Sequence, residues 1–239
     1  MRGCPPLVMF ALVATAAVSG WAHPSAAQSP ISVVSIGIYD YADVPSEQLS
    51  RARQAVSRLF AAIDVRIAWL GPYRTSHLQP HTRFEPHTRT PDLAVLILDA
   101  KMTRALGPQA HSLGCAPGTA LERGRIAYVF YGRLTNVVWS DEGVVKLLSL
   151  VIAHEIGHLL LPYGSHSDTG VMRSRWSVTE LRRVDLARVG FTSSQVEAIR
   201  RRLFGNDAGD RHATNLNWGD DWSDGTHGPN LRAQRLAPD

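Results

Sequence analysis

Two histidines and a glutamate stand close together in the segment His154-Glu155-Ile156-Gly157-His158. In a helix, residues four apart lie on one face, so His154 and His158 can bind the same zinc ion through their imidazoles. Glu155 is next to the first of them and can reach a zinc-bound water as general base. Zinc lowers the pKa of such a water to about 7, which makes hydroxide available at neutral pH. The spacing therefore predicts a hydrolytic zinc site.

The surrounding sequence predicts that this segment is part of a central helix. The helix is expected from about Glu142 to Leu161, and its residues from Val144 to Leu161 are strongly apolar, which is typical of a buried helix. Ser140 or Asp141 can cap the start of this helix, and the Pro162 that follows it marks its end. Two histidines and a glutamate in a buried helix need a reason, and a shared metal ion supplies one.

A third zinc ligand is expected from the chain after this helix, because a catalytic zinc usually has three protein ligands and one position for water. His166 is the preferred candidate, since Pro162 to Gly164 allow the chain to turn back beneath the metal. Asp168 and Glu180 remain alternative third ligands.

The stretch from His154 to Trp176, HEIGHLLLPYGSHSDTGVMRSRW, resembles the metzincin clan of zinc metalloproteases. Metzincins have the motif HExxHxxGxxH, followed by a turn that carries a methionine below the metal. The stretch is more similar still to uncharacterised, predicted bacterial secreted metalloproteases with a HEIGHLLL, HS and GVM pattern. It departs from the clan because Leu161 and Gly164 occupy the usual glycine and third-histidine positions, and His166 follows two residues later. By the resemblance Met172 lies below the metal, whereas a methionine in a turn otherwise packs in a core.

The resemblance implies an α+β fold, a metzincin-like zincin domain. Its small mixed sheet would pack on an N-terminal helix and a central active-site helix, with short C-terminal helices. It implies a zinc-dependent endopeptidase that acts on a peptide or protein substrate, with Glu155 as general base. The strand Arg125–Leu134 would then be the sheet edge along which an extended peptide pairs. Two alternatives stay open: a zinc-binding module without catalysis, against which the intact Glu155 argues, and a hydrolase of another amide bond, such as one in the cell wall.

Hydrophobic patterning predicts the elements that position these residues. Segment 101–124 is expected to be irregular because two Gly-Pro or Pro-Gly pairs interrupt it. Four strands are expected, at Ile31–Tyr39, Val65–Leu70, Leu93–Leu98 and Arg125–Leu134. Further helices are expected at Ser46 to about Ala62, near Val178–Val189 and at Ser193–Phe204.

The two ends of the chain predict segments outside the catalytic domain. Residues 1–27 have a positive start, an apolar run and small residues before Ala27, which is the pattern of a secretory signal peptide. The run is shorter than the roughly 20 residues of a membrane span. We therefore expect a secreted or periplasmic protein without stable membrane insertion. The zincin-like domain is predicted to cover residues 28–204, and the polar residues 205–239 to form a flexible tail.

Composition excludes some classes of function. With 44% hydrophobic residues the chain can bury a core, and a formal net charge of +4 without a dense Lys/Arg run does not predict nucleic-acid binding. Once the predicted signal peptide with Cys4 is removed, Cys115 is the one remaining thiol. Cys115 either binds the zinc and keeps the enzyme latent or is unreactive. We expect an unreactive thiol and an enzyme that is active without processing.

Overall fold

The structure, a computed structural model, describes residues 32–74, 90–107, 111–119 and 124–204. All of them belong to one compact unit that begins at Ile31. The predicted signal peptide and the predicted polar tail lie outside the described residues, so both stay predictions.

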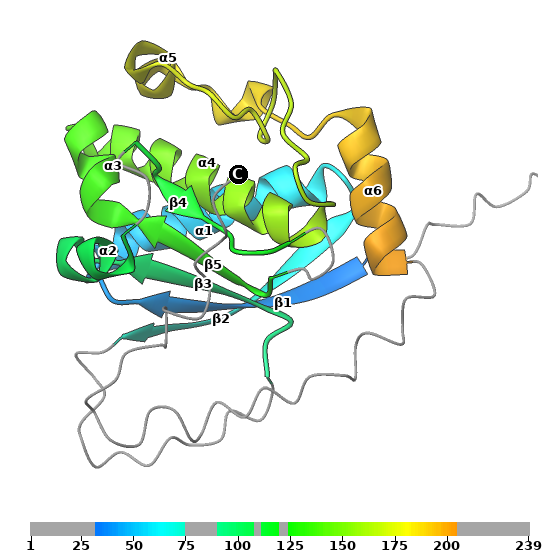
Figure 1. Ribbon diagram of the computed structural model, residues 1–239, viewed down its shortest axis with the longest axis horizontal. Coiled ribbons are helices and arrows are strands. Elements are labelled where there is room, and N and C mark those ends of the chain that lie inside the picture. The colour runs from blue at the N-terminus through cyan, green and yellow to red at the C-terminus, as the bar shows by residue number, and fades with distance from the viewer. Residues whose placement is uncertain (1–31, 75–89, 108–110, 120–123, 205–239) are drawn as a thin grey trace, which may run out of the picture. The chain divides into compact units, whose positions relative to one another are not determined.

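A single five-stranded sheet organises the described chain, with the strand order β2-β1-β3-β5-β4 (Figure 1). The first four of these strands run parallel, whereas β4 pairs antiparallel with β5 at the edge of the sheet. The α+β class with a small mixed sheet is thereby confirmed. The strands are β1 (Ser32–Asp40), β2 (Val65–Arg74), β3 (Leu93–Leu98), β4 (Gly114–Cys115) and β5 (Ile126–Phe130).

Helices α1 (Ser46–Ala61) and α4 (Asp141–Leu160) pack against each other and against one face of the sheet (Figure 1). In α1 the buried side chains recur at helical spacing, so one face of an amphipathic helix meets the core. The start of α4 is capped by Ser140, whose side chain accepts a hydrogen bond from Gly143 N. Most of α4 is buried, and although it is long and apolar enough to cross a membrane, its apolar side chains form the core of this fold.

The predicted strand Arg125–Leu134 is wrong in its second half and in its place in the sheet. The strand with alternating side chains ends at Phe130, and helix α3 (Tyr131–Val137) begins at the next residue. Leu134, the buried residue of α3, enters the main core, where α3 packs on α4. β5 is also an interior strand, because β4 covers its outer side.

The segment expected to be irregular contains two regular elements. Helix α2 (Ala100–Leu106) starts at Asp99, whose Oδ1 accepts a hydrogen bond from Met102 N, and ends at Gly107 with φ 67°. These are ordinary helix start and stop signals. The two-residue strand β4 depends on its pairing with β5, which a local pattern cannot reveal.

Two further element boundaries differ from the prediction. β2 continues past Gly71-Pro72 to Arg74, because Tyr73 and Arg74 still pair with β1. The helix expected near Val178–Val189 is split into α5 (Val178–Arg183) and the 3-10 helix η2 (Leu186–Arg188). At the break, the Asp185 side chain accepts a hydrogen bond from Ala187 N and starts η2. Helix α6 covers Ser193–Phe204 as predicted.

Candidate metal centre

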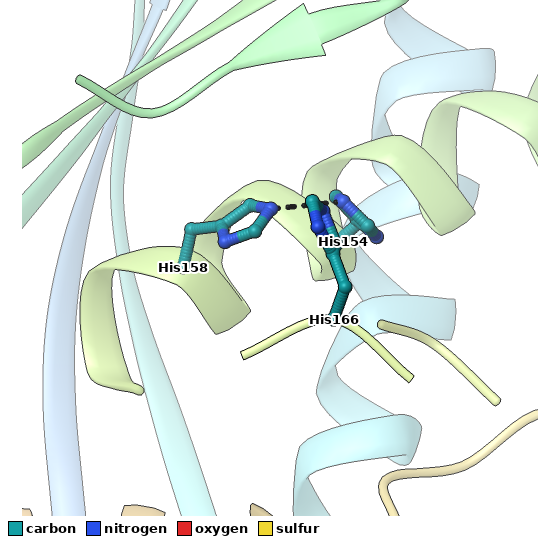
Figure 2. Close-up of side chains that lie close together, drawn as sticks. All are labelled: His154, His158 and His166. Atoms are coloured by element: carbon teal, nitrogen blue, oxygen red, sulfur yellow. Dashed lines mark hydrogen bonds between the residues drawn. The ribbon is translucent and has the colours of Figure 1, made fainter. Parts of the chain in front are cut away.

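Three histidines converge beside α4. His154 and His158 project from one face of the helix, and His166 points toward them from the loop that follows it (Figure 2). One ring nitrogen of each histidine lies within 4.8 Å of those of the other two. The Nε2 atoms of His154 and His158 are 3.0 Å apart. Two nitrogens bound to a tetrahedral zinc at about 2.0–2.1 Å would be roughly 3.3 Å apart. The structure thus brings the three predicted ligands together in a group that could hold a metal ion.

The electrostatics of the histidines also suit a bound cation. Burial lowers the pKa of His158 to about 3, helped by the neighbouring His154 and His166. Burial likewise lowers the pKa of His154, although its contact with the Val171 carbonyl opposes the shift. Both imidazoles are therefore neutral at pH 7 and keep a lone pair, which is the form that binds a metal.

A backbone contact determines which nitrogen of His154 faces the metal. Its Nδ1 lies 2.7 Å from Val171 O. Because a carbonyl only accepts hydrogen bonds, Nδ1 carries the proton and Nε2 is left with its lone pair. Val171 is held in turn, since its N–H donates to Gly190 O at 2.9 Å. The ring of His154 is thus oriented by the turn after the metal loop.

Glu155 is a buried carboxyl group on the same helix. The residue is 5% exposed, and among the described residues its Oε2 has no hydrogen-bond partner. Burial raises the pKa of this carboxyl group to about 8. An unpartnered buried carboxylate is costly, and a nearby cation is one of the few ways to offset that cost. The donor set and this orphaned oxygen together fit a divalent metal.

The edge strand β4 lies directly against Glu155. A Cβ atom added to Gly114 would be 2.7 Å from Glu155 Oε1 and 2.8 Å from the backbone oxygen of Tyr128. Glycine is thus the residue that leaves room for the carboxyl group. Sequence reasoning missed Gly114, because its role depends on a strand pairing and not on a local motif.

Met172 packs against helix α4 at Gly157. It is fully buried in the main core, and a Cβ added at Gly157 would be 2.3 Å from its Sδ. Its sulfur therefore sits against α4 at the residue before His158. Core packing is thereby shown for this methionine, and its place below the metal stays a prediction.

The alternative third ligands lie outside this group of histidines. Glu180 closes the capping box of α5 with Ser177 and also pairs with Arg173 Nη1 at 2.8 Å. Hydrogen bonds from Ser177 and then from Arg173 lower the pKa of Glu180 to about 2. Asp168 is exposed on the loop two residues after His166.

Cys115 faces away from the histidines. Neighbouring residues of a strand point to opposite faces, and Gly114 faces Glu155. Cys115 accordingly packs with Tyr128 and Ile126 in a second apolar cluster, separate from the main core. Burial, together with the charge of Glu155, raises the pKa of this thiol to about 12, so it is protonated at neutral pH.

Comparison with known proteins shows that this chain is similar to several solved structures. No family model and no curated protein matches this chain. Among solved structures, the chain is similar to archaemetzincin from Methanopyrus kandleri, with a TM-score of 0.47 and 18% identity over 72% of this chain and 96% of that one. It is also similar to metalloproteinase-II from Bacteroides fragilis, with a TM-score of 0.44 and 15% identity over 72% of this chain and 54% of that one. A third similar structure is myroilysin, with a TM-score of 0.31 and 11% identity over 69% and 70% of the two chains. The chemistry of the site is therefore inferred from its own residues.

Proposed function

We propose that this protein is a secreted zinc-dependent endopeptidase. His154, His158 and His166 would hold the metal, and Glu155 would be the general base. The observation that carries the proposal is the convergence of three imidazole nitrogens within 4.8 Å of one another, beside a buried carboxyl group. Export is supported by the signal-peptide pattern of residues 1–27.

The residues of the site would divide the reaction between them. Zinc bound to the three histidines would supply a Lewis acid and a water molecule of lowered pKa. Glu155 would take a proton from the attacking water and return it to the leaving amine. Burial raises the pKa of this carboxyl group in the metal-free chain, and a bound cation would lower it again, so that the ionised carboxylate could accept the proton. The Val171 carbonyl would keep the His154 ring in the tautomer that faces the metal.

A peptide substrate is supported by the sheet edge beside Glu155. This edge is β4 and not β5. Phe130 N donates to Leu113 O, so Leu113 and Phe130 are a hydrogen-bonded pair of the two antiparallel strands. Such pairs alternate with pairs that are not hydrogen-bonded, and the next pair, Gly114 with Val129, is of the second kind. The N–H and C=O of Gly114 therefore point away from β5. An extended peptide that paired with this edge would lie next to the general base.

The test is the variant Glu155→Gln, assayed on a generic peptide substrate with zinc content measured in parallel. Loss of the general base should lower activity by at least about 100-fold. Zinc content should stay at one ion per chain, because Glu155 is not a predicted ligand. The matched control is Glu142→Gln on the same helix, an exposed residue paired with Arg51 and Lys146, which should keep full activity. Equal activity in Glu155→Gln, or a wild-type chain without peptidase activity, would contradict the proposal.

A further inference from the structure

Gln195 is a buried polar residue that the proposed site does not yet use. It lies on α6 and is 6% exposed. Its Nε2 donates to Ser165 O and to Ser167 Oγ, each at 3.1 Å. Ser165 and Ser167 are the two residues on either side of His166. One amide group from a distant helix therefore holds both neighbours of the predicted third ligand.

The amide group of Gln195 is itself fixed in orientation. Its Oε1 accepts a hydrogen bond from Thr192 N at 3.0 Å, so the NH₂ end must face the His166 loop. Helix α6 is anchored in the main core by Ile199, which is fully buried. Just before α6, the ring of Phe191 packs against Phe60 with centroids 5.1 Å apart. Gln195 thus projects from a part of the fold that packing holds in place.

The loop that carries His166 needs such a support. Pro162, Tyr163 and Gly164 are exposed, and so is His166 itself. Besides Gln195, the loop is tied by the hydrogen bond from Ser167 N to Met172 O at 2.9 Å. Ordering a flexible ligand when a metal binds costs conformational entropy, and a hydrogen bond that orders it beforehand reduces that cost.

We infer that Gln195 is a positioning residue that holds His166 toward His154 and His158 and so raises the affinity for zinc. The inference rests on the proposed function, because it takes the three histidines to be the ligands. Gln195 would act through Ser165 and Ser167 and not as a ligand.

The experiment measures zinc affinity of the full chain by competition with a coloured chelator. Gln195→Leu removes both donors and the acceptor at similar volume. Gln195→Glu removes the donors toward Ser165 and Ser167 but keeps the acceptor for Thr192 N, so it covers the case in which the first variant fails to fold. Loss of such an outer contact should weaken zinc binding by about 10- to 100-fold. The control is Gln54→Leu on the exposed side of α1, which should leave the affinity unchanged.

A double-mutant cycle separates positioning from a general effect on the fold. In a His166→Ala background, Gln195→Leu should cause no further loss of zinc affinity, because the ligand it holds is gone. An equal loss in both backgrounds, or no loss in either, would overturn the inference. If the wild-type chain binds zinc tightly while the Gln195 variants bind it equally well, the inference fails alone. If the wild-type chain does not bind zinc, the proposed function fails with it.

Discussion

The contact between Gly114 and Glu155 leads to a quantitative prediction for Gly114→Ala. The new Cβ would lie 2.7 Å from Glu155 Oε1, and ordinary contact begins at 3.4 Å. The carboxyl group must therefore retreat by about 0.7 Å, the difference between these two distances. The strand cannot take up the shift easily, because the same Cβ is 2.8 Å from the backbone oxygen of Tyr128 in β5. A misplacement of about 1 Å in an active site can cost about 100-fold in rate.

We accordingly expect kcat of Gly114→Ala to fall by about 10- to 100-fold on a peptide substrate. Zinc content should be unchanged, because none of the three histidines is among the nearest contacts of that Cβ. The matched control is Gly132→Ala in α3, where the nearest atom to a new Cβ is the Ala100 Cβ at 3.6 Å. That change should keep activity and stabilise the helix by about 0.5–1 kcal/mol. Full activity in Gly114→Ala would refute the spacing argument, and loss of zinc from it would show that β4 acts on the ligands instead.

Three further predictions follow from the same region. Gly157→Ala should lower the free energy of unfolding by about 1–3 kcal/mol, because the new Cβ would overlap the Met172 sulfur. Helix propensity alone would raise the free energy of unfolding. Denaturant unfolding of the variant and the wild type shows which of the two effects is larger. Freshly purified Cys115→Ala should be as active as the wild type. The wild-type thiol should react slowly with thiol reagents at pH 7, because its pKa is raised to about 12. A large gain of activity in the variant would instead show that Cys115 keeps the enzyme latent. In metal-free protein, the stability that Glu155 contributes should be complete below about pH 4.5 and be lost as the pH rises through about 8, because the folded state holds its proton more tightly than the unfolded chain. As the pH is raised from 5 to 8.5, the unfolding midpoint of Glu155→Gln should therefore rise relative to that of the wild type. A difference between the two midpoints that does not change with pH would contradict the raised pKa of Glu155.

The parts of this site that the sequence could predict are those with a local signal. His154, Glu155 and His158 are close in sequence, and the apolar residues around them define α4 without reference to the rest of the fold. The strand Leu93–Leu98 was predicted to the residue, because its continuous apolar run is buried along its whole length. In both cases the pattern of neighbouring residues contains the information.

The parts that could not be predicted depend on contacts across long sequence separations. β4 is two residues long, and it becomes a strand because β5 lies beside it. Gly114 meets Glu155 and Gln195 meets the His166 loop only after the chain has folded. The predicted strand extends into α3 from the alternating residues Ile126, Tyr128 and Phe130, but the alternation ends at Phe130, and the packing of Leu134 on α4 favours a helix there. Tertiary packing overrides local propensity in each of these places.

The chain after Leu160 differs from the rest of the described fold in how it is held. Among the described residues it adds no strand to the sheet, and its buried apolar side chains are few: Leu161, Val171, Met172, Leu181, Val184 and Ile199. The part of this chain before α6, residues 161–192, has few buried contacts, and such a segment opens at a lower free energy than the core, as hydrogen exchange would report. A metal shared between α4 and His166 would add its binding free energy to the closed state of this segment. Chains that had lost the ion would open there more often and be cut sooner by any protease present, so metal loading would also decide which copies of the protein persist.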